Sequence, residues 1–348
     1  MHGWLDNMVS RQRNNGILLI NLGTPDDTSK SAIRRYLREF LSDPRVVDIH
    51  PVARWVLLNV IILPFRTPKT AHAYQKVWTD EGSPLMVNSN NFTKKLRQEN
   101  HGMHIELGMR YGNPSIKSAL VKLIDAGVEH IKIVPLFPQY ASATNGSAIE
   151  KTMALLSKRQ AIPTFEIIPP FYHDPDYIDA LAQSIQPTLD KKQPEHLLLS
   201  YHGLPERQLD KLENTECCNK QDTCAIIQAR NQFCYRAQCY QTSHLLAKKL
   251  NLNQDQYGVS FQSRLGKIPW IKPYTDNRLT ELRKQGVQRI AIACPAFVAD
   301  CLETIEEIGM AAKEQWFESG GKEFTLIPCL NDNPSWVQSF NKIMDVNR

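Results

Sequence analysis

Short apolar runs alternate with longer amphipathic stretches along most of the chain, a pattern typical of parallel strands connected by helices. The apolar runs predict strands at 16–22, 104–109, 131–137, 165–169, 197–201, 257–262 and 289–293. Helical periodicity predicts helices at 31–41, 116–126, 146–158, 177–189, 239–250 and 279–286. The repeated alternation predicts an α/β fold.

A turn-rich stretch at 169–175 (PPFYHDP) divides the predicted strands into two groups. We therefore expect two similar Rossmann-like domains with parallel sheets flanked by helices, at 15–170 and 171–330. A last helix at 333–348 is expected to pack back on the first domain. Because open α/β sheets bind ligands outside the carboxyl ends of their strands, the active-site cleft is expected between the two domains.

The composition fits this interpretation, since 348 residues with 42% hydrophobic and 22% charged side chains are typical of a folded protein of about two domains. Basic residues number 41 and acidic residues 36, for a formal charge of +5 without a long basic run. That small excess permits an anionic ligand and argues against a nucleic-acid partner.

The first sixteen residues contain no apolar core of the kind that a secretory signal requires, which predicts a cytoplasmic protein. The longest apolar stretch, 55–65 (WVLLNVIILPF), is interrupted by Asn59 and Pro64 and is shorter than the ~20 residues of a membrane-spanning helix.

Two strand exits carry candidate chemistry. The run 197–201 ends in His202 followed by Gly203, which predicts an imidazole on a turn at the cleft, able to accept a proton or bind a metal. The alternative is a histidine that is merely hydrogen-bonded in a loop. The second exit leads into 294–307 (CPAFVADCLETIEE).

Glu303 and Glu307 are four residues apart and therefore share one face of a predicted helix, with Asp300 one turn earlier. Such a row of carboxylates could hold a divalent cation or relay protons. Two structural alternatives compete with this interpretation, because Asp300 and Glu303 also fit a helix capping box and acidic residues favour helix N-termini.

Several motifs, in order along the chain, resemble those of ferrochelatases, which insert ferrous iron into a porphyrin. They are INLGTP from Ile20, REFLSDPRVVD from Arg38, EGSPL from Glu81, MRYGNPSI from Met109, SYHGLPER from Ser200, FQSRLGKIPWIKPYTD from Phe261 and CPAFVADCLETIEEI from Cys294. The resemblance covers almost the whole chain and implies a bacterial-type, chelatase-like enzyme.

The resemblance implies that His202 and Glu303 face each other across the cleft as the site of the substrate Fe²⁺, with Glu307 and Glu306 continuing the acidic face. Insertion must remove two pyrrole protons and strip water from iron, and an unprotonated His202 is suited to accept protons. Catalytic roles are therefore expected for His202, Glu303 and Glu307.

The resemblance also implies a flat apolar slot for the porphyrin, with polar anchors for its propionates. The expected apolar lining residues are Leu22, Leu41, Trp55, Phe137, Trp270 and Phe297. The expected polar contacts are Arg66, Ser83, Arg110, Tyr111 and Gln262. Arginine suits this task because its planar guanidinium pairs with a carboxylate through two hydrogen bonds.

The stretch 52–65, followed by Arg66 and Lys69, has two interpretations. It is either an apolar lip that touches an anionic bilayer, so that the protein is peripheral to the inner face of the membrane, or a buried amphipathic helix.

Five of the eight cysteines, namely Cys217, Cys218, Cys224, Cys234 and Cys239, lie in or beside an insert at 214–236. In a reducing cytoplasm this clustering indicates metal rather than disulfides. We expect a [2Fe-2S] cluster held by Cys217 or Cys218 together with Cys224, Cys234 and Cys239; tetrahedral zinc and no metal are the alternatives. The resemblance to ferrochelatases implies that Cys239 is also present in members without the insert and need not be a ligand. The resemblance implies that mitochondrial ferrochelatases bind a [2Fe-2S] cluster partly through an upstream cysteine. Ser142 stands where that cysteine is expected, so this form of the cluster is not expected here.

These observations favour a lyase that inserts Fe(II) into protoporphyrin IX to form protohaem, the last step of haem biosynthesis. The alternatives are a coproporphyrin ferrochelatase, a cobaltochelatase of the same fold, or a non-enzymatic tetrapyrrole carrier. A monomer and a homodimer are both compatible with the sequence.

Overall fold

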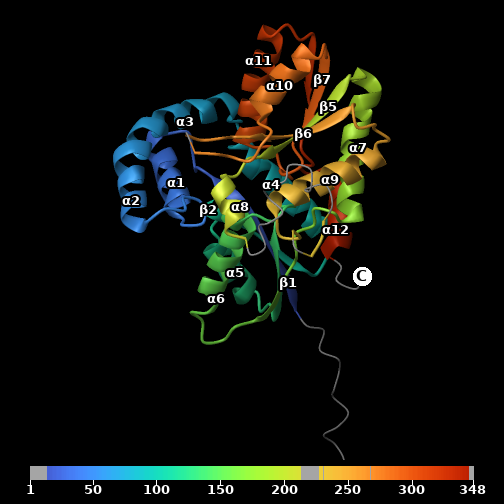
Figure 1. Ribbon diagram of the computed structural model, residues 1–348. Helices are drawn as coiled ribbons and strands as arrows, with labels where there is room; N and C mark the ends of the chain where they lie inside the picture. Colours follow the sequence, from blue (N-terminus) through green and yellow to red (C-terminus); the bar gives the residue numbers. More distant parts are fainter. Residues whose placement is uncertain (1–13, 213–226, 230, 267, 345–348) are drawn as a thin grey trace, which may run out of the picture.

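The computed structural model describes residues 14–212, 227–229, 231–266 and 268–344 (Figure 1). Its strands form two four-stranded sheets in which all pairings are parallel. The first sheet, in the order β2-β1-β3-β4, contains β1 (Asn15–Thr24), β2 (His104–Gly112), β3 (His130–Pro135) and β4 (Thr164–Ile167). The second, in the order β6-β5-β7-β8, contains β5 (His196–His202), β6 (Tyr257–Gln262), β7 (Arg289–Ala293) and β8 (Glu323–Leu326). The predicted α/β fold with two parallel sheets is confirmed.

Helices connect the strands and cover the sheets (Figure 1). Those before β5 are α1 (Lys30–Ser42), α2 (Pro51–Val56), the π-helix η1 (Leu57–Ile62), α3 (Leu63–Val77), α4 (Pro84–Glu99), α5 (Ile116–Asp125), the π-helix η2 (Ser142–Gly146), α6 (Ser147–Leu156) and α7 (Pro175–Lys192). Those after β5 are α8 (Glu206–Asp210), α9 (Tyr235–Lys249), α10 (Thr275–Lys284), the π-helix η4 (Glu303–Ala312), α11 (Lys313–Glu318) and α12 (Pro334–Met344).

The central strands are buried because their sequences are almost continuously apolar. β5 (HLLLSYH) is buried in every residue except its last, and β1 is buried over most of its length. One hydrophobic core cluster contains Leu19 of β1 together with Leu199 of β5, so the two sheets share a core. This common core holds the carboxyl ends of the two sheets in a fixed relation.

Elements with weak patterns were not predicted. β8 has only four residues, and three of them are half-buried, so its apolar signal is short. The segment 51–99 contains α2, η1, α3 and α4. Apart from the amphipathic helix considered at 52–65, no helix was predicted there, because Pro51, Pro64, Pro68 and Pro84 interrupt the pattern. Three of these prolines stand in the first turn of a helix, where a missing N–H costs little.

Helix α12 packs against α7 and α4. Its fully buried Trp336 stacks on Phe92 of α4 with ring centroids 5.8 Å apart, and Phe340 meets the same ring edge-on at 5.1 Å. Helix α12 thereby contacts a helix from the first half, and its aromatic pairs stabilise the contact beyond the apolar area that they bury.

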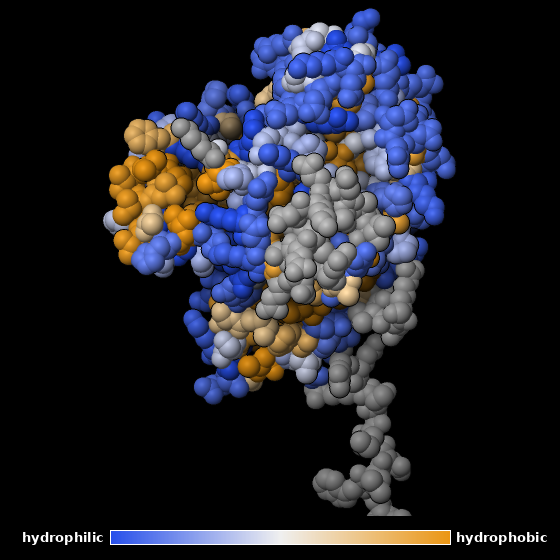
Figure 2. Space-filling view, in the orientation of Figure 1, coloured by the Kyte–Doolittle hydropathy of each residue, from blue (hydrophilic) through white to orange (hydrophobic). Residues whose placement is uncertain are grey.

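Helices α2 and α3 and the π-helix η1 project at the left of the molecule and carry an apolar surface, here called the lip (Figures 1 and 2). Its exposed side chains are Val52, Trp55, Val56, Val60, Ile61 and Phe65. Leu58 and Leu63 alone of this stretch are buried, so the interpretation of 52–65 as a buried amphipathic helix is wrong. Among the described helices, none is both long and apolar enough to cross a membrane.

A pH-dependent contribution to stability is predicted for His196, the first residue of β5. Its side chain is buried, Nδ1 lies 3.0 Å from the carbonyl oxygen of Asp255, and burial lowers the pKa of the imidazole below 6.5. The unfolded chain therefore binds a proton that the folded chain does not, and stability should fall as pH drops below about 6.5.

We expect His196→Gln to reduce the pH dependence of the free energy of unfolding between pH 7.5 and 5.5, by at most about 1.4 kcal/mol per pH unit. Urea unfolding at several pH values measures it. An unchanged pH dependence in the variant would contradict the assignment.

Candidate active site

His202 is the last residue of β5 and lies half-buried where the strand leaves the sheet. Its Nδ1 lies 2.6 Å from the carbonyl oxygen of Gly203. Because a carbonyl oxygen only accepts, Nδ1 carries the hydrogen in the neutral ring, and Nε2 has the free lone pair. Tyr235 holds the strand end by donating a hydrogen bond of 2.9 Å to the carbonyl oxygen of His202. The imidazole is thus oriented to use Nε2 as a base or ligand.

The parallel pairing of β5 with β6 places Gln262 beside His202 in register. Gln262 is buried, and its Nε2 donates a hydrogen bond of 2.9 Å to the carbonyl oxygen of Glu303, the first residue of the π-helix η4. Its Oε1 accepts a hydrogen bond of 2.7 Å from Ser200. Gln262 therefore links the exits of two strands to the start of the helix that carries the acidic row.

Glu303, Glu306 and Glu307 are half-buried on η4, and Thr304 is fully buried. The helix is a π-helix over ten residues, a form that is rare and often found at functional sites. Asp300 precedes it and accepts hydrogen bonds from Thr304 Oγ1 at 2.9 Å and Asn331 Nδ2 at 2.7 Å. Asp300 thus ties η4 to a neighbouring loop instead of forming the capping box with Glu303.

The next residue after Gln262 was missed by sequence reasoning. Ser263 donates two hydrogen bonds to the carboxylate of Glu307, from its backbone N–H at 2.6 Å and from its hydroxyl at 2.5 Å. Burial raises the pKa of Glu307, while the bonds from Ser263 and the charge of His202 oppose that rise. Two signals could have found it: Ser263 follows a predicted strand directly, and it belongs to the motif that begins at Phe261.

The acidic row also faces the first half of the chain. Burial and then the charge of Glu303 raise the pKa of Tyr74, which lies on α3. Leu302 and Ile305 pack against the core cluster of α1, η1 and α3, and Lys76 of α3 lies 3.4 Å from Glu306. The site is therefore bounded by the carboxyl edge of the second sheet on one side and by the helices of the lip on the other.

The structure places some of the expected porphyrin contacts near this site. The ring of Phe297 lies 6.4 Å from that of His202, and Trp270 is buried next to Gly203. Leu22 and Leu41 belong to the core cluster under the lip, where Arg66 is exposed on α3 and Trp55 on α2. Phe137 packs on a different core cluster of the first sheet.

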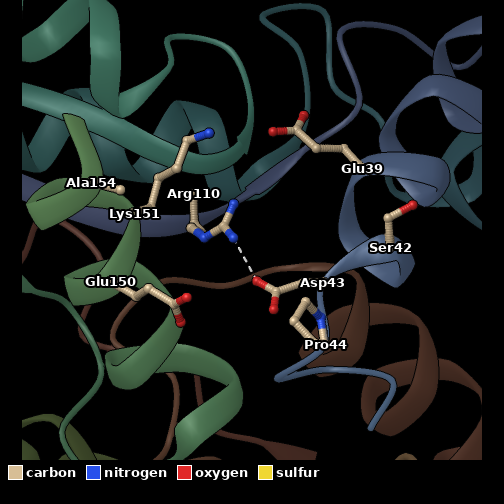
Figure 3. Close-up of a pocket in the computed structure, with 8 residues that line it drawn as sticks. All are labelled: Glu39, Ser42, Asp43, Pro44, Arg110, Glu150, Lys151 and Ala154. Carbon is tan, nitrogen blue, oxygen red and sulfur yellow. Dashed lines mark hydrogen bonds and ion pairs between the residues drawn. The ribbon is translucent and has the colours of Figure 1, made fainter. Parts of the chain in front are cut away.

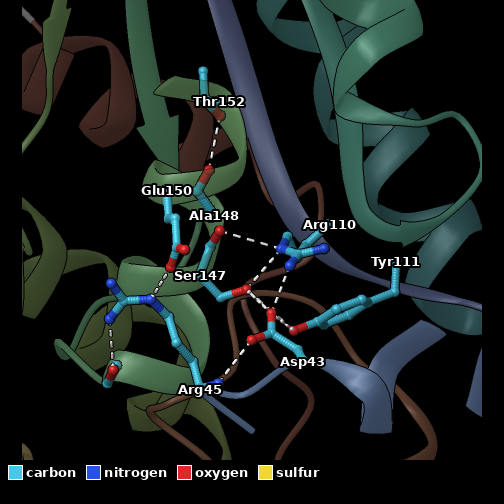
Figure 4. Close-up of polar contacts among 9 residues, drawn as sticks. Asp43, Arg45, Arg110, Tyr111, Ser147, Ala148, Glu150 and Thr152 are labelled. Atoms are coloured by element: carbon cyan, nitrogen blue, oxygen red, sulfur yellow. Dashed lines mark hydrogen bonds and ion pairs between the residues drawn. The ribbon is translucent and has the colours of Figure 1, made fainter. Parts of the chain in front are cut away.

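Other expected contacts are already engaged within the protein. Ser83 is buried and accepts the hydrogen bond that caps α4. Arg110 pairs with Asp43 at 2.5 Å and donates to Ser147, while Tyr111 donates to Asp43 at 2.8 Å (Figure 4). A ligand carboxylate would have to compete with Asp43 for Arg110.

This polar cluster adjoins a cavity of about 320 Å³ (Figure 3). Burial would raise the pKa of Asp43, but the bonds from Ser147, Arg45 and Tyr111 and the charge of Arg110 together lower it. The cavity is lined by Glu39, Ser42, Asp43, Pro44, Arg110, Glu150, Lys151 and Ala154. The ionised Asp43 thus joins α1, β2 and α6.

The cysteines of the insert lie partly beyond the described residues, since Cys217, Cys218 and Cys224 fall in the undescribed stretch 213–226. Cys234 and Cys239 are buried; Cys234 directly precedes α9, and Cys239 lies within it. Cys239 is fully buried in the shared core. Within the part of the chain that the structure describes, no group of three or more His, Cys, Asp or Glu residues could hold a metal ion.

Two parallel α/β units with a histidine and carboxylates at the carboxyl edge define a chelatase-like protein. In fold the chain is similar to SirB from Bacillus subtilis with Fe³⁺, with a TM-score of 0.54, 11% identity and coverage of 94% of this chain and 93% of that chain. It is also similar to the sirohydrochlorin chelatase SirB from Bacillus subtilis subspecies spizizenii in complex with cobalt, with a TM-score of 0.52 and the same identity and coverage.

The chain belongs to the ferrochelatase family, whose sequence model matches residues 14–347. It is 51% identical over 331 residues to the ferrochelatase of Legionella pneumophila (strain Paris), covering 95% of this chain and 98% of that protein. It is 47% identical over 330 residues to a ferrochelatase of Coxiella burnetii, with 94% and 92% covered. The resemblance inferred from the ordered motifs is confirmed.

We predict that Asp43→Asn destabilises the protein by about 3–5 kcal/mol, because it leaves the guanidinium of Arg110 in a largely buried position without its counter-charge. Denaturant unfolding measures the change. The matched control is Asp179→Asn, which removes an exposed partner of Lys249 and should cost about 0–1 kcal/mol. Equal losses in both variants would contradict the structural role of Asp43.

Proposed function

We propose that this protein is a protoporphyrin ferrochelatase, a lyase that inserts Fe(II) into protoporphyrin IX and releases two protons. The observation that carries the proposal is the half-buried His202, with Nε2 free, held beside an acidic π-helix by Gln262. Membership of the ferrochelatase family gives the porphyrin and ferrous iron as substrates. Coproporphyrin, cobalt insertion and a carrier role are less well supported by relatives of about 50% identity.

In this proposal His202 accepts pyrrole protons through Nε2 and contributes to the iron site with Glu303 as its partner. Glu307 continues the acidic face and passes protons onward or holds a hydrated cation. Leu22, Phe297 and Trp270 contribute apolar lining for the ring, and Arg66 is the exposed candidate for a propionate. Arg110, Tyr111, Ser83 and Gln262 make the internal hydrogen bonds described above, so in this proposal they would have to exchange these partners to contact the porphyrin.

The test is an anaerobic assay of Fe(II) insertion into protoporphyrin and coproporphyrin side by side. We expect the higher kcat/KM with protoporphyrin, and we expect His202→Ala to lose activity about 100-fold or more. A preference for coproporphyrin would overturn the substrate assignment. Near-normal insertion by His202→Ala at saturating substrates would overturn the role of the histidine.

We also propose that the lip rests on a membrane surface, with the protein in the cytoplasm. Six exposed apolar side chains of the lip support this proposal, among them Trp55 at 63% and Phe65 at 70% exposure. The neighbouring Arg66 and Lys69 add positive charge. Apolar side chains that enter the interface, together with basic residues near anionic headgroups, favour this kind of binding.

Trp55→Glu/Phe65→Glu should reduce flotation of the protein with anionic phospholipid vesicles. The control is Ile162→Glu. Ile162 is an exposed apolar residue, at 51%, that lies outside the lip, so this variant should float like the wild type. If the double variant floats as well as the control, the membrane contact is wrong.

For the insert we propose a [2Fe-2S] cluster, supported by the density of cysteines around 217–239. Cys239 lies beyond the insert at 214–236, within helix α9, so the four cysteines inside the insert, namely Cys217, Cys218, Cys224 and Cys234, are the thiolates that we assign to the cluster. Protein purified without oxygen should be coloured and contain iron and acid-labile sulfide; Cys224→Ser should lose both, while Cys239→Ser keeps them. A colourless, iron-free wild type would contradict the cluster, and bound zinc would support the tetrahedral alternative.

A further inference from the structure

The exit of β6 holds the π-helix η4 at two successive points. Gln262 binds the backbone of Glu303 through Nε2, and the following residue, Ser263, binds the side chain of Glu307. Gln262 is itself fixed, because its Oε1 accepts a hydrogen bond from Ser200 and its own carbonyl oxygen accepts the N–H of Gly203 at 2.8 Å. The hydrogen bonds of Gln262 therefore fix the position of the following residue, Ser263.

The backbone of Ser263 has φ = +66°, in the left-handed region that favours glycine. A serine in this conformation costs free energy that the surroundings must supply, and such residues concentrate at functional sites. The conformation has a visible result: the N–H donates to Oε1 of Glu307 and the hydroxyl donates to Oε2. Each carboxylate oxygen has its own donor.

Two donors on one carboxylate fix its rotation and favour its charged form. A fixed rotation matters for Glu307, because it lies half-buried on η4 four residues after Glu303, in the same acidic row. If Glu307 only accepted a hydrogen bond to stabilise the fold, neither its charge nor the positive φ of Ser263 would be needed. We therefore interpret the two hydrogen bonds as fixing the position of the Glu307 carboxylate.

We propose that Ser263 is a positioning residue that holds the Glu307 carboxylate in its place on the acidic row for metal insertion. This inference rests on the proposed function, because it assigns Glu307 a part in that reaction. Ser263 acts through Glu307 and does not itself contact the reacting atoms.

The experiment compares Ser263→Gly with the wild type in the anaerobic protoporphyrin assay. Glycine keeps the backbone N–H and accepts the positive φ, so only the hydroxyl bond is lost. We expect kcat to fall about ten- to a hundred-fold, as for loss of a hydrogen bond to a charged group, with KM for protoporphyrin within about twofold. The melting temperature should stay equal or rise, since strain is relieved.

Two comparisons separate positioning from structure. Gln193→Gly relieves a positive φ of 44° at the end of α7, away from the site, and should leave kcat unchanged. In single-turnover assays, Ser263→Gly should have no further effect in a Glu307→Gln background, because both changes act on one unit.

An active wild type with an equally active Ser263→Gly would overturn the inference and leave the proposed function intact. Additive losses in the double variant, or a loss confined to KM, would also overturn it. A wild type that inserts iron into neither porphyrin would instead refute the proposed function, and this inference with it.

Discussion

The site depends on the in-register parallel pairing of β5 and β6. This pairing ends the two strands side by side, with His202 next to Gln262, and thereby fixes where a base and the start of η4 lie relative to each other. A shift of either strand by one residue would turn its side chain at this position to the opposite face of the sheet and separate the pair. The buried apolar run of β5 prevents such a shift, because its side chains fill the core.

The two halves of the chain contribute different kinds of side chain to the site. The second sheet supplies the titratable groups, His202 and the carboxylates of η4, at its carboxyl edge. The first half supplies an apolar wall. Tyr74 in this wall lies close enough to Glu303 for the charge of Glu303 to raise the pKa of the Tyr74 hydroxyl. The shared core and the packing of α12 on α4 and α7 keep these parts together.

Much of the fold could be predicted from the sequence, because long apolar runs mark buried parallel strands. The resemblance to ferrochelatases assigned the iron site to residues at the strand exits, and that assignment stays a prediction. His202, Glu303 and Glu307 were singled out in this way. Ser263 was not, because nothing in its type predicts a positive φ. The π-helical form of η4 and the commitment of Arg110 to Asp43 also escaped, since both depend on contacts between distant segments.

Participation of the acidic row of η4 in the insertion step itself is the proposal on which the other roles depend. It is tested most directly by the single-turnover rate of Fe(II) insertion in Glu303→Gln at saturating protoporphyrin, where differences in porphyrin binding no longer count. We expect a rate at least about 100-fold below that of the wild type. A rate within about twofold of the wild type would contradict it.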